Sequence, residues 1–203
     1  MLRLYDYLPS GNGYKVRLLL TQLGLPFQLI ELDIMRGETR TPAYLCKNPN
    51  GRVPLLELED GTLLPESNAI LYYLARDTPY FPLSRLAQAQ VLQWMCFEQY
   101  SHEPNIATAR HWIQHVGVTP EREAALAEKQ RLGRAALAVM EGHLRGHTYF
   151  VGEAYSIADI ALYAYTHVAH EGGFDLAPFG AIAAWLARVR AQPRHLAITA
   201  RPG

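Results

Sequence analysis

The change in character after about residue 75 constrains the fold more than any other feature of the sequence. Before that point, strand-like and helix-like patterns alternate, and after it the strand signal disappears. Apolar and β-branched residues predict strands, a Gly or Pro after a periodic run predicts a helix end, and Asp60-Gly61 predicts a tight hairpin. The expected elements are a strand at 2–6, a helix at 14–24, a strand at 27–34, a helical turn near 42–46, a hairpin at 53–64 and a helix at 66–75.

These elements predict a small mixed sheet. A helix joins the first two strands, so we expect them to be parallel, whereas the hairpin makes the last two antiparallel. Residues 76–83 contain two prolines and indicate a linker. Beyond it we expect only helices, at 84–115 with a bend near Pro104, 120–145, 156–170 and 180–191. The sequence therefore predicts an α/β domain with a four-stranded mixed sheet at 1–75 and an all-helical domain at 84–203.

Charge and cysteine content exclude several classes of protein. The 19 basic and 19 acidic residues balance, so no excess of charge favours nucleic acid or an anionic membrane. The two cysteines, Cys46 and Cys96, form neither a CxxC motif nor a Cys/His metal motif, and we expect no metal. No apolar run approaches the roughly 18 residues of a membrane span. We expect a soluble, cytoplasmic protein with reduced thiols.

The segment Leu8–Leu20, "LPSGNGYKVRLLL", is a glycine-containing turn between the first strand and the first helix. Such turns can hold phosphate, but Val16 stands where a dinucleotide fingerprint needs its third glycine, and no G-K-[ST] enters the helix. What remains is a helix N-terminus that presents Ser10 and Asn12, where free N–H groups favour negative charge. The simpler interpretation is that Ser10 or Asn12 only caps the helix.

Two further dipeptides have the same double interpretation. Val53-Pro54 is either an ordinary trans strand start or a cis bond that turns the backbone of Val53 toward an extended peptide. Glu66-Ser67 lies directly before a helix, where Ser67 is either the N-cap or, with the helix N-terminus, a holder for a carboxylate, while Glu66 takes an ammonium group. Ser156 and Asp159 have the spacing of a capping box, and we expect a structural role for them.

Together, the order and spacing of these motifs resemble the glutathione S-transferase family over essentially the whole chain. The resemblance implies a thioredoxin-like N-terminal domain that binds glutathione as cosubstrate, and a helical domain that supplies most of the second-substrate pocket. Ser10 lies six residues before Val16, as the serine of theta-class enzymes does before its valine. It also matches the first serine of the zeta-class turn, but Asn12 stands where zeta enzymes have a cysteine. The Asn-Gly-x-Lys portion is similar to bacterial enzymes in which a Thr and an Asn approach the glutathione sulfur, some of which reduce disulfides.

The resemblance also assigns roles to the site residues. Ser10 and Asn12 would be catalytic, Val53 with Pro54 would pair with the cysteinyl backbone, and Glu66 with Ser67 would hold the γ-glutamyl end. Arg52 and Thr39 would face the glycine carboxylate. The residues expected to face the second substrate are Tyr100, Asn105, Arg110 and Trp112. The turn has neither the tyrosine of the alpha, mu and pi classes nor the cysteine of the omega class; Tyr5 and Tyr7 do not match the tyrosine position.

The implied activity is detoxification by a homodimeric transferase. Glutathione thiolate would attack a small electrophile or reduce a disulfide or peroxide, with Ser10 donating a hydrogen bond to the sulfur and Asn12 adding a second. The alternative is a non-catalytic binding or assembly protein that has kept the same fold, as translation-associated relatives have.

Overall fold

The computed structural model describes residues 1–201 and divides the chain into two compact units. The first comprises Met1–Thr78 together with the C-terminal segment that begins at Pro193, and the second comprises Pro79–Gln192. We call them the sheet unit and the helical unit. The helical unit therefore ends at Gln192, whereas the sequence had predicted a helical domain that continues to residue 203. The C-terminal segment carries no helix or strand periodicity that would have shown where it packs.

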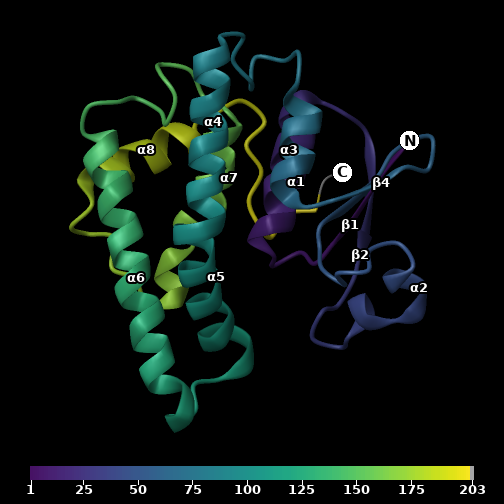
Figure 1. The fold of residues 1–203 in the computed structure, drawn as a ribbon, viewed down its shortest axis with the longest axis horizontal. Helices are drawn as coiled ribbons and strands as arrows, with labels where there is room; N and C mark the ends of the chain where they lie inside the picture. Colours follow the sequence, from purple (N-terminus) through teal and green to yellow (C-terminus); the bar gives the residue numbers. More distant parts are fainter. Residues whose placement is uncertain (202–203) are drawn as a thin grey trace. The chain divides into compact units, whose positions relative to one another are not determined.

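The sheet unit contains the expected mixed four-stranded sheet, in the order β2-β1-β3-β4. β1 (Leu2–Asp6) pairs in parallel with β2 (Phe27–Glu31) and antiparallel with β3 (Leu55–Glu57), which pairs antiparallel with β4 (Leu63–Pro65). Helices α1 (Gly11–Leu23) and α3 (Ser67–Ala75) lie together on one face, and the short α2 (Pro42–Leu45) lies beyond the other (Figure 1). A 3₁₀ turn, η1 (Glu38–Arg40), precedes α2.

The alternation of side chains along β1 explains these two layers. Leu4 and its partner Leu56 are fully buried, and Tyr5 and its partner Leu55 point to the opposite face, where they pack with Tyr44 of α2. Successive residues of a strand face opposite sides, so one five-residue strand serves both layers. The C-terminal half of β1 and the whole of β3 are therefore buried on both faces.

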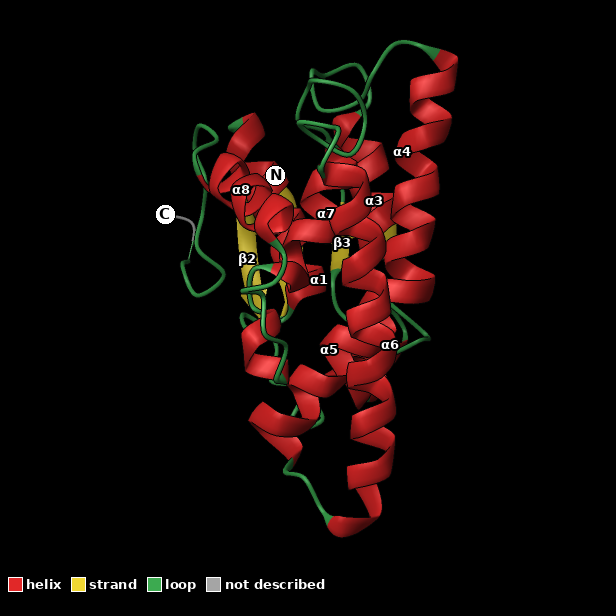
Figure 2. Cartoon of the chain, turned by 90° about the vertical axis from the view of Figure 1, so that its left-hand side faces the viewer, coloured by secondary structure: helices red, strands yellow, loops and turns green. Residues whose placement is uncertain are grey.

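The helical unit contains α4 (Arg85–Phe97), α5 (Glu103–His111), α6 (Pro120–Leu144), α7 (Ile157–Thr166), η4 (Ala169–Gly172) and α8 (Gly180–Arg190). Within residues 1–201, strands occur only in the sheet unit (Figure 2). The prediction of one bent helix over 84–115 was too simple. Two π-helical segments, η2 (Glu98–His102) and η3 (Trp112–Val116), flank α5. Pro104, at the start of α5, lacks the N–H that a continuous helix would use there, and this explains the interruption at η2.

The capping box at the start of α7 is confirmed. The carboxylate of Asp159 accepts hydrogen bonds from the backbone N–H of Ser156 at 2.9 Å and from its hydroxyl at 3.1 Å. It also accepts from the N–H of Phe150 at 3.1 Å and from the indole of Trp185 at 2.9 Å. Burial raises the pKa of Asp159 to about 6. This carboxylate joins α7 to α8 in the core of the helical unit.

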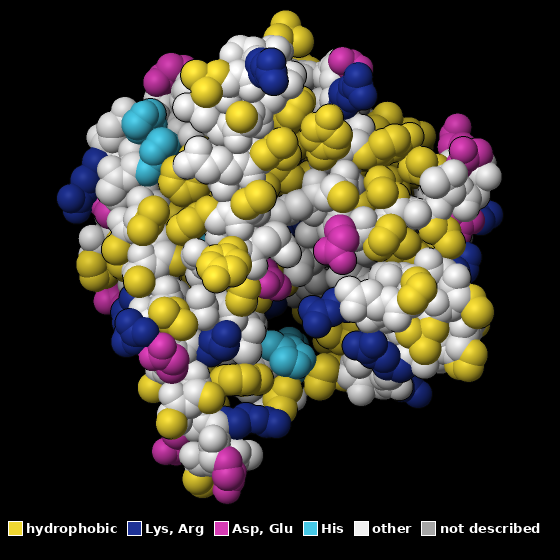
Figure 3. Space-filling model, in the orientation of Figure 1, with side chains coloured by type: hydrophobic (Ala, Val, Ile, Leu, Met, Phe, Trp, Pro, Cys, Tyr) yellow, Lys and Arg dark blue, Asp and Glu magenta, His cyan; other side chains and the backbone are white. Residues whose placement is uncertain are grey.

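The surface is of mixed character. Figure 3 shows apolar side chains and charged side chains of both signs intermixed on one face. Among the residues that the structure describes, no helix combines the length and apolar character needed to cross a membrane.

Candidate functional site: one edge of the sheet

The ends of three strands gather the predicted glutathione-site residues at one edge of the sheet. Tyr5 pairs with Leu55, and Leu55 pairs with Pro65. The C-terminal end of β1, the N-terminal end of β3 and the C-terminal end of β4 therefore meet at the same edge. The Ser10 turn follows the first of these ends, Val53-Pro54 precedes the second, and Glu66-Ser67 follows the third.

Ser10 is the N-cap of α1. The backbone N–H of Gly13 donates to Ser10 Oγ at 3.2 Å, and the backbone of Ser10 is extended, at φ −69° and ψ 123°. α1 begins at Gly11, three residues earlier than the sequence pattern indicated, because this cap satisfies an N–H group of the first turn. A hydroxyl that accepts one hydrogen bond still has its own hydrogen to donate. The capping role therefore leaves the O–H of Ser10 available to a ligand.

Gly13 is required by a carboxylate beneath the turn. A Cβ on Gly13 would lie 1.5 Å from Oδ1 of Asp6, which is fully buried. Asp6 accepts hydrogen bonds from Arg17 Nε and from the N–H of Tyr7, each at 2.7 Å. Burial raises the pKa of Asp6 to about 6 despite the guanidinium beside it. This glycine makes room for a structural ion pair rather than for a phosphate.

Asn12 and Ser67 lie in direct contact, although 55 positions separate them in the sequence. Ser67 Oγ donates to Asn12 Oδ1 at 3.2 Å, and the ammonium of Lys15 donates to the same Asn12 oxygen at 2.8 Å and to Ser67 Oγ at 3.5 Å. Lys15 is fully buried and Ser67 is 6% exposed. The first turns of α1 and α3 therefore meet at a buried positive charge.

The interpretation of Ser67 as N-cap is wrong. Ser67 is the first residue of α3, and Glu66 occupies the cap position with no side-chain hydrogen bond to the helix. Glu66 is exposed and has φ 72° and ψ 110°, in the region that L-residues rarely adopt. Such conformations concentrate at binding sites, where surrounding structure holds them in place. The Ser67 side chain donates to Asn12 instead of capping α3.

The Val53-Pro54 bond is cis, which was one of the two alternatives that the sequence left open. The neighbouring segment is held by side chains of α2 and the turn after it. The carbonyl of Arg52 accepts from the hydroxyl of Tyr44 at 2.7 Å and from Nδ2 of Asn48 at 2.9 Å. Arg52 itself is exposed, whereas Thr39 in η1 is 4% exposed. Of the two residues expected to face the glycine carboxylate, only Arg52 presents its side chain to solvent.

The four second-substrate candidates have different environments in the helical unit. Tyr100 is 88% exposed and Trp112 is half-buried. Asn105 is buried and donates to the carbonyl of Ser101 at 2.7 Å. Arg110 donates to Glu171 at 2.6 Å. This carboxylate neutralises the guanidinium that the sequence had suggested for an acidic substrate.

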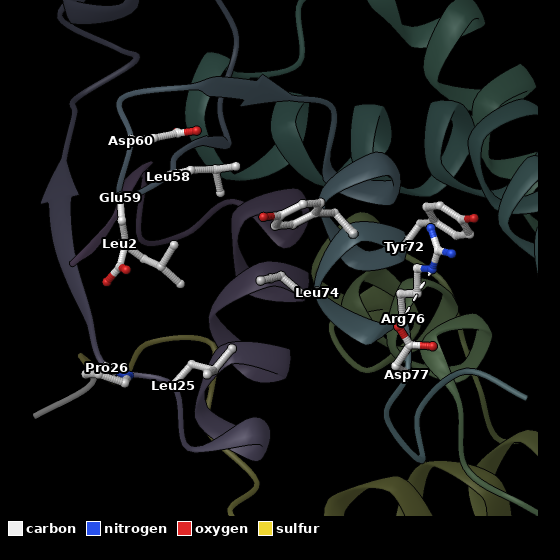
Figure 4. A pocket seen from close by; sticks show the side chains of 11 residues that line it. Leu2, Leu25, Pro26, Leu58, Glu59, Asp60, Tyr72, Leu74, Arg76 and Asp77 are labelled. Carbon is white, nitrogen blue, oxygen red and sulfur yellow. Dashed lines mark ion pairs between the residues drawn. The ribbon is translucent and has the colours of Figure 1, made fainter.

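A hollow in the sheet unit lies at the other end of α1. It has a volume of about 790 Å³, and Figure 4 shows apolar side chains and the Arg76–Asp77 pair around it. Its lining residues are Leu2, Leu25, Pro26, Leu58, Glu59, Asp60, Tyr72, Tyr73, Leu74, Arg76 and Asp77. A 13-residue helix is about 20 Å long, so this hollow is remote from the Ser10 turn.

Two family models match the chain. "Glutathione S-transferase, N-terminal domain" matches residues 1–76 and "Glutathione S-transferase, C-terminal domain" matches residues 92–193. With the mixed sheet, the helical unit and the Ser10 turn, these matches show that the chain belongs to the glutathione S-transferase family. The fold and family expected from the sequence are thus confirmed.

Known relatives of the chain are diverse. A glutathione S-transferase from Pseudomonas fluorescens is 52% identical, with 97% of this chain and 98% of that chain covered at a TM-score of 0.95. The glutathione S-transferase-like protein LUC7 of Fusarium sp is 34% identical (92% of this chain, 87% of the relative), and the disulfide-bond oxidoreductase YfcG of Escherichia coli is 31% identical (95% and 92%).

Two other matches bear on ligand and role. A glutathione transferase homologue from sulfitobacter, solved with bound glutathione, is 26% identical at a TM-score of 0.82, with 96% of this chain and 94% of that chain covered. Elongation factor 1-gamma-A of Xenopus laevis is 32% identical over 96% of this chain, which spans 45% of that protein.

The prediction from sequence missed Lys15 and Arg17 as parts of this edge. Both are cations in the first two turns of α1, where the helix dipole disfavours positive charge. That mismatch is the signal that could have found them. The structure shows their partners: Lys15 contacts Asn12 and Ser67, and Arg17 contacts Asp6 and the carbonyl of Leu8 at 2.6 Å.

Proposed function

We propose that this chain is an enzyme that binds glutathione at the Ser10 edge of the sheet and holds its thiol as a thiolate. The contact between Asn12 and Ser67 carries the proposal, because it joins the turn expected to face the sulfur to the helix expected to hold the γ-glutamyl end. The hydroxyl of Ser10 donates to the thiolate and does not attack it. Asn12 adds a second donor through its amide nitrogen.

The other groups of glutathione are bound by residues at the same edge of the sheet. Glu66 takes the γ-glutamyl ammonium, and Ser67 with the start of α3 takes the neighbouring carboxylate. Val53, beside the start of β3, pairs with the cysteinyl backbone. Arg52 takes the glycine carboxylate, and the burial of Thr39 favours a supporting role for it. A relative of the same fold that was solved with bound glutathione supports glutathione as the ligand.

The energy required is modest. A free thiol with a pKa of about 8.5 is roughly 3% ionised at pH 7, and a pKa of about 6.5 would raise that to roughly 76%. This shift takes about 2.7 kcal/mol. A hydroxyl donating to an anion contributes about 1.5–3 kcal/mol, and a helix N-terminus contributes about 0.3–1 kcal/mol. Ser10 and the start of α1 therefore supply most of what is needed.

The thiolate then either attacks a small electrophile or reduces a disulfide or peroxide. Similarity to a disulfide-bond oxidoreductase over 92% of that relative favours reduction as the first reaction to assay. We also propose that the protein is a homodimer, as its resemblance to the glutathione S-transferase family implies. Tyr100 and Trp112 are proposed to contact the second substrate. The second candidate function is a non-catalytic assembly role, which the similarity to an elongation-factor subunit supports.

Binding and thiol ionisation test the proposal directly. The protein should be retained on immobilised glutathione, and the ultraviolet absorbance of bound thiolate should titrate well below the free thiol. Ser10→Ala should raise the bound thiol pKa by about one unit. Failure of the wild-type protein to bind glutathione would favour the assembly role. An unchanged pKa in the variant would remove Ser10 from the mechanism. Aryl halide, organic peroxide and hydroxyethyl disulfide substrates would then identify the reaction.

A further inference from the structure

The segment that follows α6 encloses a hollow against α8 in the helical unit, where the end of α6 packs beside the start of α8 (Figure 1). The hollow has a volume of about 290 Å³ and is open to solvent. Its basic lining residues are Arg145, His147 and Arg188, and no acidic residue lines it in the part of the chain that the structure describes. A hollow whose walls carry charge of one sign is suited to a ligand of the opposite sign.

The carboxylate of Glu141 is bonded to two residues of this hollow, but it is already engaged. It accepts from the backbone N–H groups of Ala181 at 3.2 Å and Ile182 at 3.0 Å, and from Nε of Arg145 at 3.4 Å. The side chain of Glu141 is 9% exposed, whereas that of Arg145 is 72% exposed. One buried carboxylate is therefore shared between the N-terminus of α8 and Arg145, and the two guanidinium groups of the hollow leave an excess of positive charge.

Both arginines keep their terminal amino groups available. Arg188 donates through Nε to the carbonyl of Thr148 at 3.1 Å, and the hydroxyl of Thr148 donates to Glu153. Within residues 1–201, neither Arg188 nor Arg145 makes a hydrogen bond through Nη1 or Nη2. A guanidinium has five N–H donors in a fork, and the four on its terminal nitrogens match the oxygens of a phosphate. The Nε contacts therefore orient each fork and leave those donors for a ligand.

His147 adds a ring nitrogen to the lining of the hollow. Its Nδ1 donates to the carbonyl of His143 at 2.8 Å, because a carbonyl oxygen can only accept. The two imidazole rings stack in parallel, with centroids 4.0 Å apart and 5° between their planes. Nε2 of His147 makes no hydrogen bond to any described residue, so it is the nitrogen left to a ligand. It accepts from a ligand O–H when the ring is neutral and donates to a ligand oxygen when the ring is protonated.

We propose that this hollow is a binding site for a small molecule that carries a phosphate group. The forks of Arg145 and Arg188 hold the phosphate oxygens, and Nε2 of His147 contacts the same group. A phosphate monoester has a charge of about −1.5 to −2 at pH 7 and three acceptor oxygens, so it matches two guanidinium groups better than a carboxylate does. The volume of the hollow restricts the ligand to a small ester. The site lies wholly in the helical unit, and the function proposed for the Ser10 edge does not depend on it.

Titration of the full chain, without glutathione and at constant ionic strength, tests this site. The probes are glycerol 3-phosphate, inorganic phosphate and succinate, and calorimetry measures their dissociation constants. We expect the ester to bind at least about tenfold more tightly than succinate, which has a similar charge but no phosphate. Inorganic phosphate that binds as tightly as the ester would support the phosphate contacts and identify free phosphate as the ligand. Succinate that binds as tightly as the ester, or no saturable binding of either phosphate below about 10 mM, overturns the proposal.

Matched arginine variants test where the phosphate binds. Arg145→Gln and Arg188→Gln should each weaken binding of the ester by about tenfold or more, because each removes charge-assisted hydrogen bonds. Arg131→Gln is the control, since Arg131 is exposed on α6 and pairs with Glu128 at 2.7 Å, and it should change the affinity by less than about twofold. Circular dichroism checks folding, and the exposed Arg145 decides the test if Arg188→Gln does not fold. Unchanged affinity in Arg145→Gln, or an equal loss in Arg131→Gln, overturns the proposal.

Discussion

At the scale of single residues, the proposed site depends on a glycine that leaves no room for a Cβ. Gly13 lies against Asp6 and donates its N–H to Ser10, so one residue serves both the buried ion pair and the cap. Asn12 and Lys15, on either side of it, face Ser67 of α3. The spacing Ser-Gly-Asn-Gly-x-Lys is therefore a packing requirement as well as a chemical one.

Gly13→Ala should destabilise the protein by about 2–3 kcal/mol, because its Cβ would overlap the Asp6 carboxylate. Urea unfolding followed by circular dichroism measures this change. Gly142→Ala is the matched control, since Gly142 lies within α6 and a Cβ there meets no atom within 4 Å. That substitution should stabilise the protein by up to about 1 kcal/mol. Equal effects of the two substitutions would show that the Asp6 contact is unimportant.

At the scale of elements, one carboxylate joins β1, β3 and the segment after α2. Glu57 accepts from Arg3 at 2.6 Å, from the hydroxyl of Tyr5 at 2.7 Å and from Lys47 at 3.2 Å. The hydrogen bond from Tyr5, followed by that from Lys47, lowers the pKa of Glu57 to about 2. This network lies on the face of the sheet that carries α2. It thereby supports the loop that leads from α2 to Val53.

Glu57 should make stability depend on pH in a known direction. Its folded pKa lies below the unfolded value of about 4.5, so its contribution is complete above pH 4.5 and is lost as pH falls from there toward 2. Glu57→Gln should therefore be destabilised relative to wild type near pH 6, and the difference should shrink in acid. Urea midpoints measured between about pH 2.5 and 6 provide the comparison. A difference independent of pH would contradict the assignment of the low pKa.

A cap and a core contact coincide at Asp159 in the helical unit. Asp159→Ala removes the carboxylate to which Ser156, Phe150 and Trp185 donate hydrogen bonds. We expect the free energy of unfolding to fall by about 3 kcal/mol, with a change in tryptophan fluorescence. Ser84→Ala is the control at a simple cap, where the N–H of Ala87 donates to Ser84 Oγ at 3.3 Å, and it should cost about 1 kcal/mol. Thermal unfolding measures both. Similar losses in the two variants would mean that the contact with Trp185 adds nothing.

At the scale of the whole molecule, the C-terminal segment completes the unit with which the chain begins. The hydroxyl of Tyr14 donates to the carbonyl of Leu196 at 2.6 Å, and Nη1 of Arg17 donates to the carbonyls of Ile198 and Ala200 at 3.0 and 3.1 Å. The same guanidinium donates to the carbonyl of Leu8, which precedes the Ser10 turn. Arg17 therefore links Ile198 and Ala200 of the C-terminal segment to the residue at the start of the proposed thiolate turn.

Ending the chain at Gln192 should destabilise the sheet unit by several kcal/mol and weaken glutathione binding, because Arg17 would lose two of its acceptors. Glutathione titration of the truncated protein by calorimetry tests this expectation. Arg201→Ala is the control, since it breaks only an exposed ion pair with Glu31 and should change stability by less than about 1 kcal/mol. Unchanged glutathione affinity after truncation would show that the segment has no influence on the turn.

Hydrophobic period, tight turns and caps act over a few residues. These local signals were therefore enough to predict the βαβ-ββα order, the helical second half and the capping box at Ser156 and Asp159. Even here, the helix starts and the π-helical segments around Pro104 differed from prediction, since boundaries depend on which N–H groups find a partner. The placement of Ser67 against Asn12, the buried ammonium of Lys15 and the return of the C-terminal segment to α1 involve residues 52 to 183 positions apart. Such contacts exist only after the sheet and helices have packed, so only the tertiary structure could decide them.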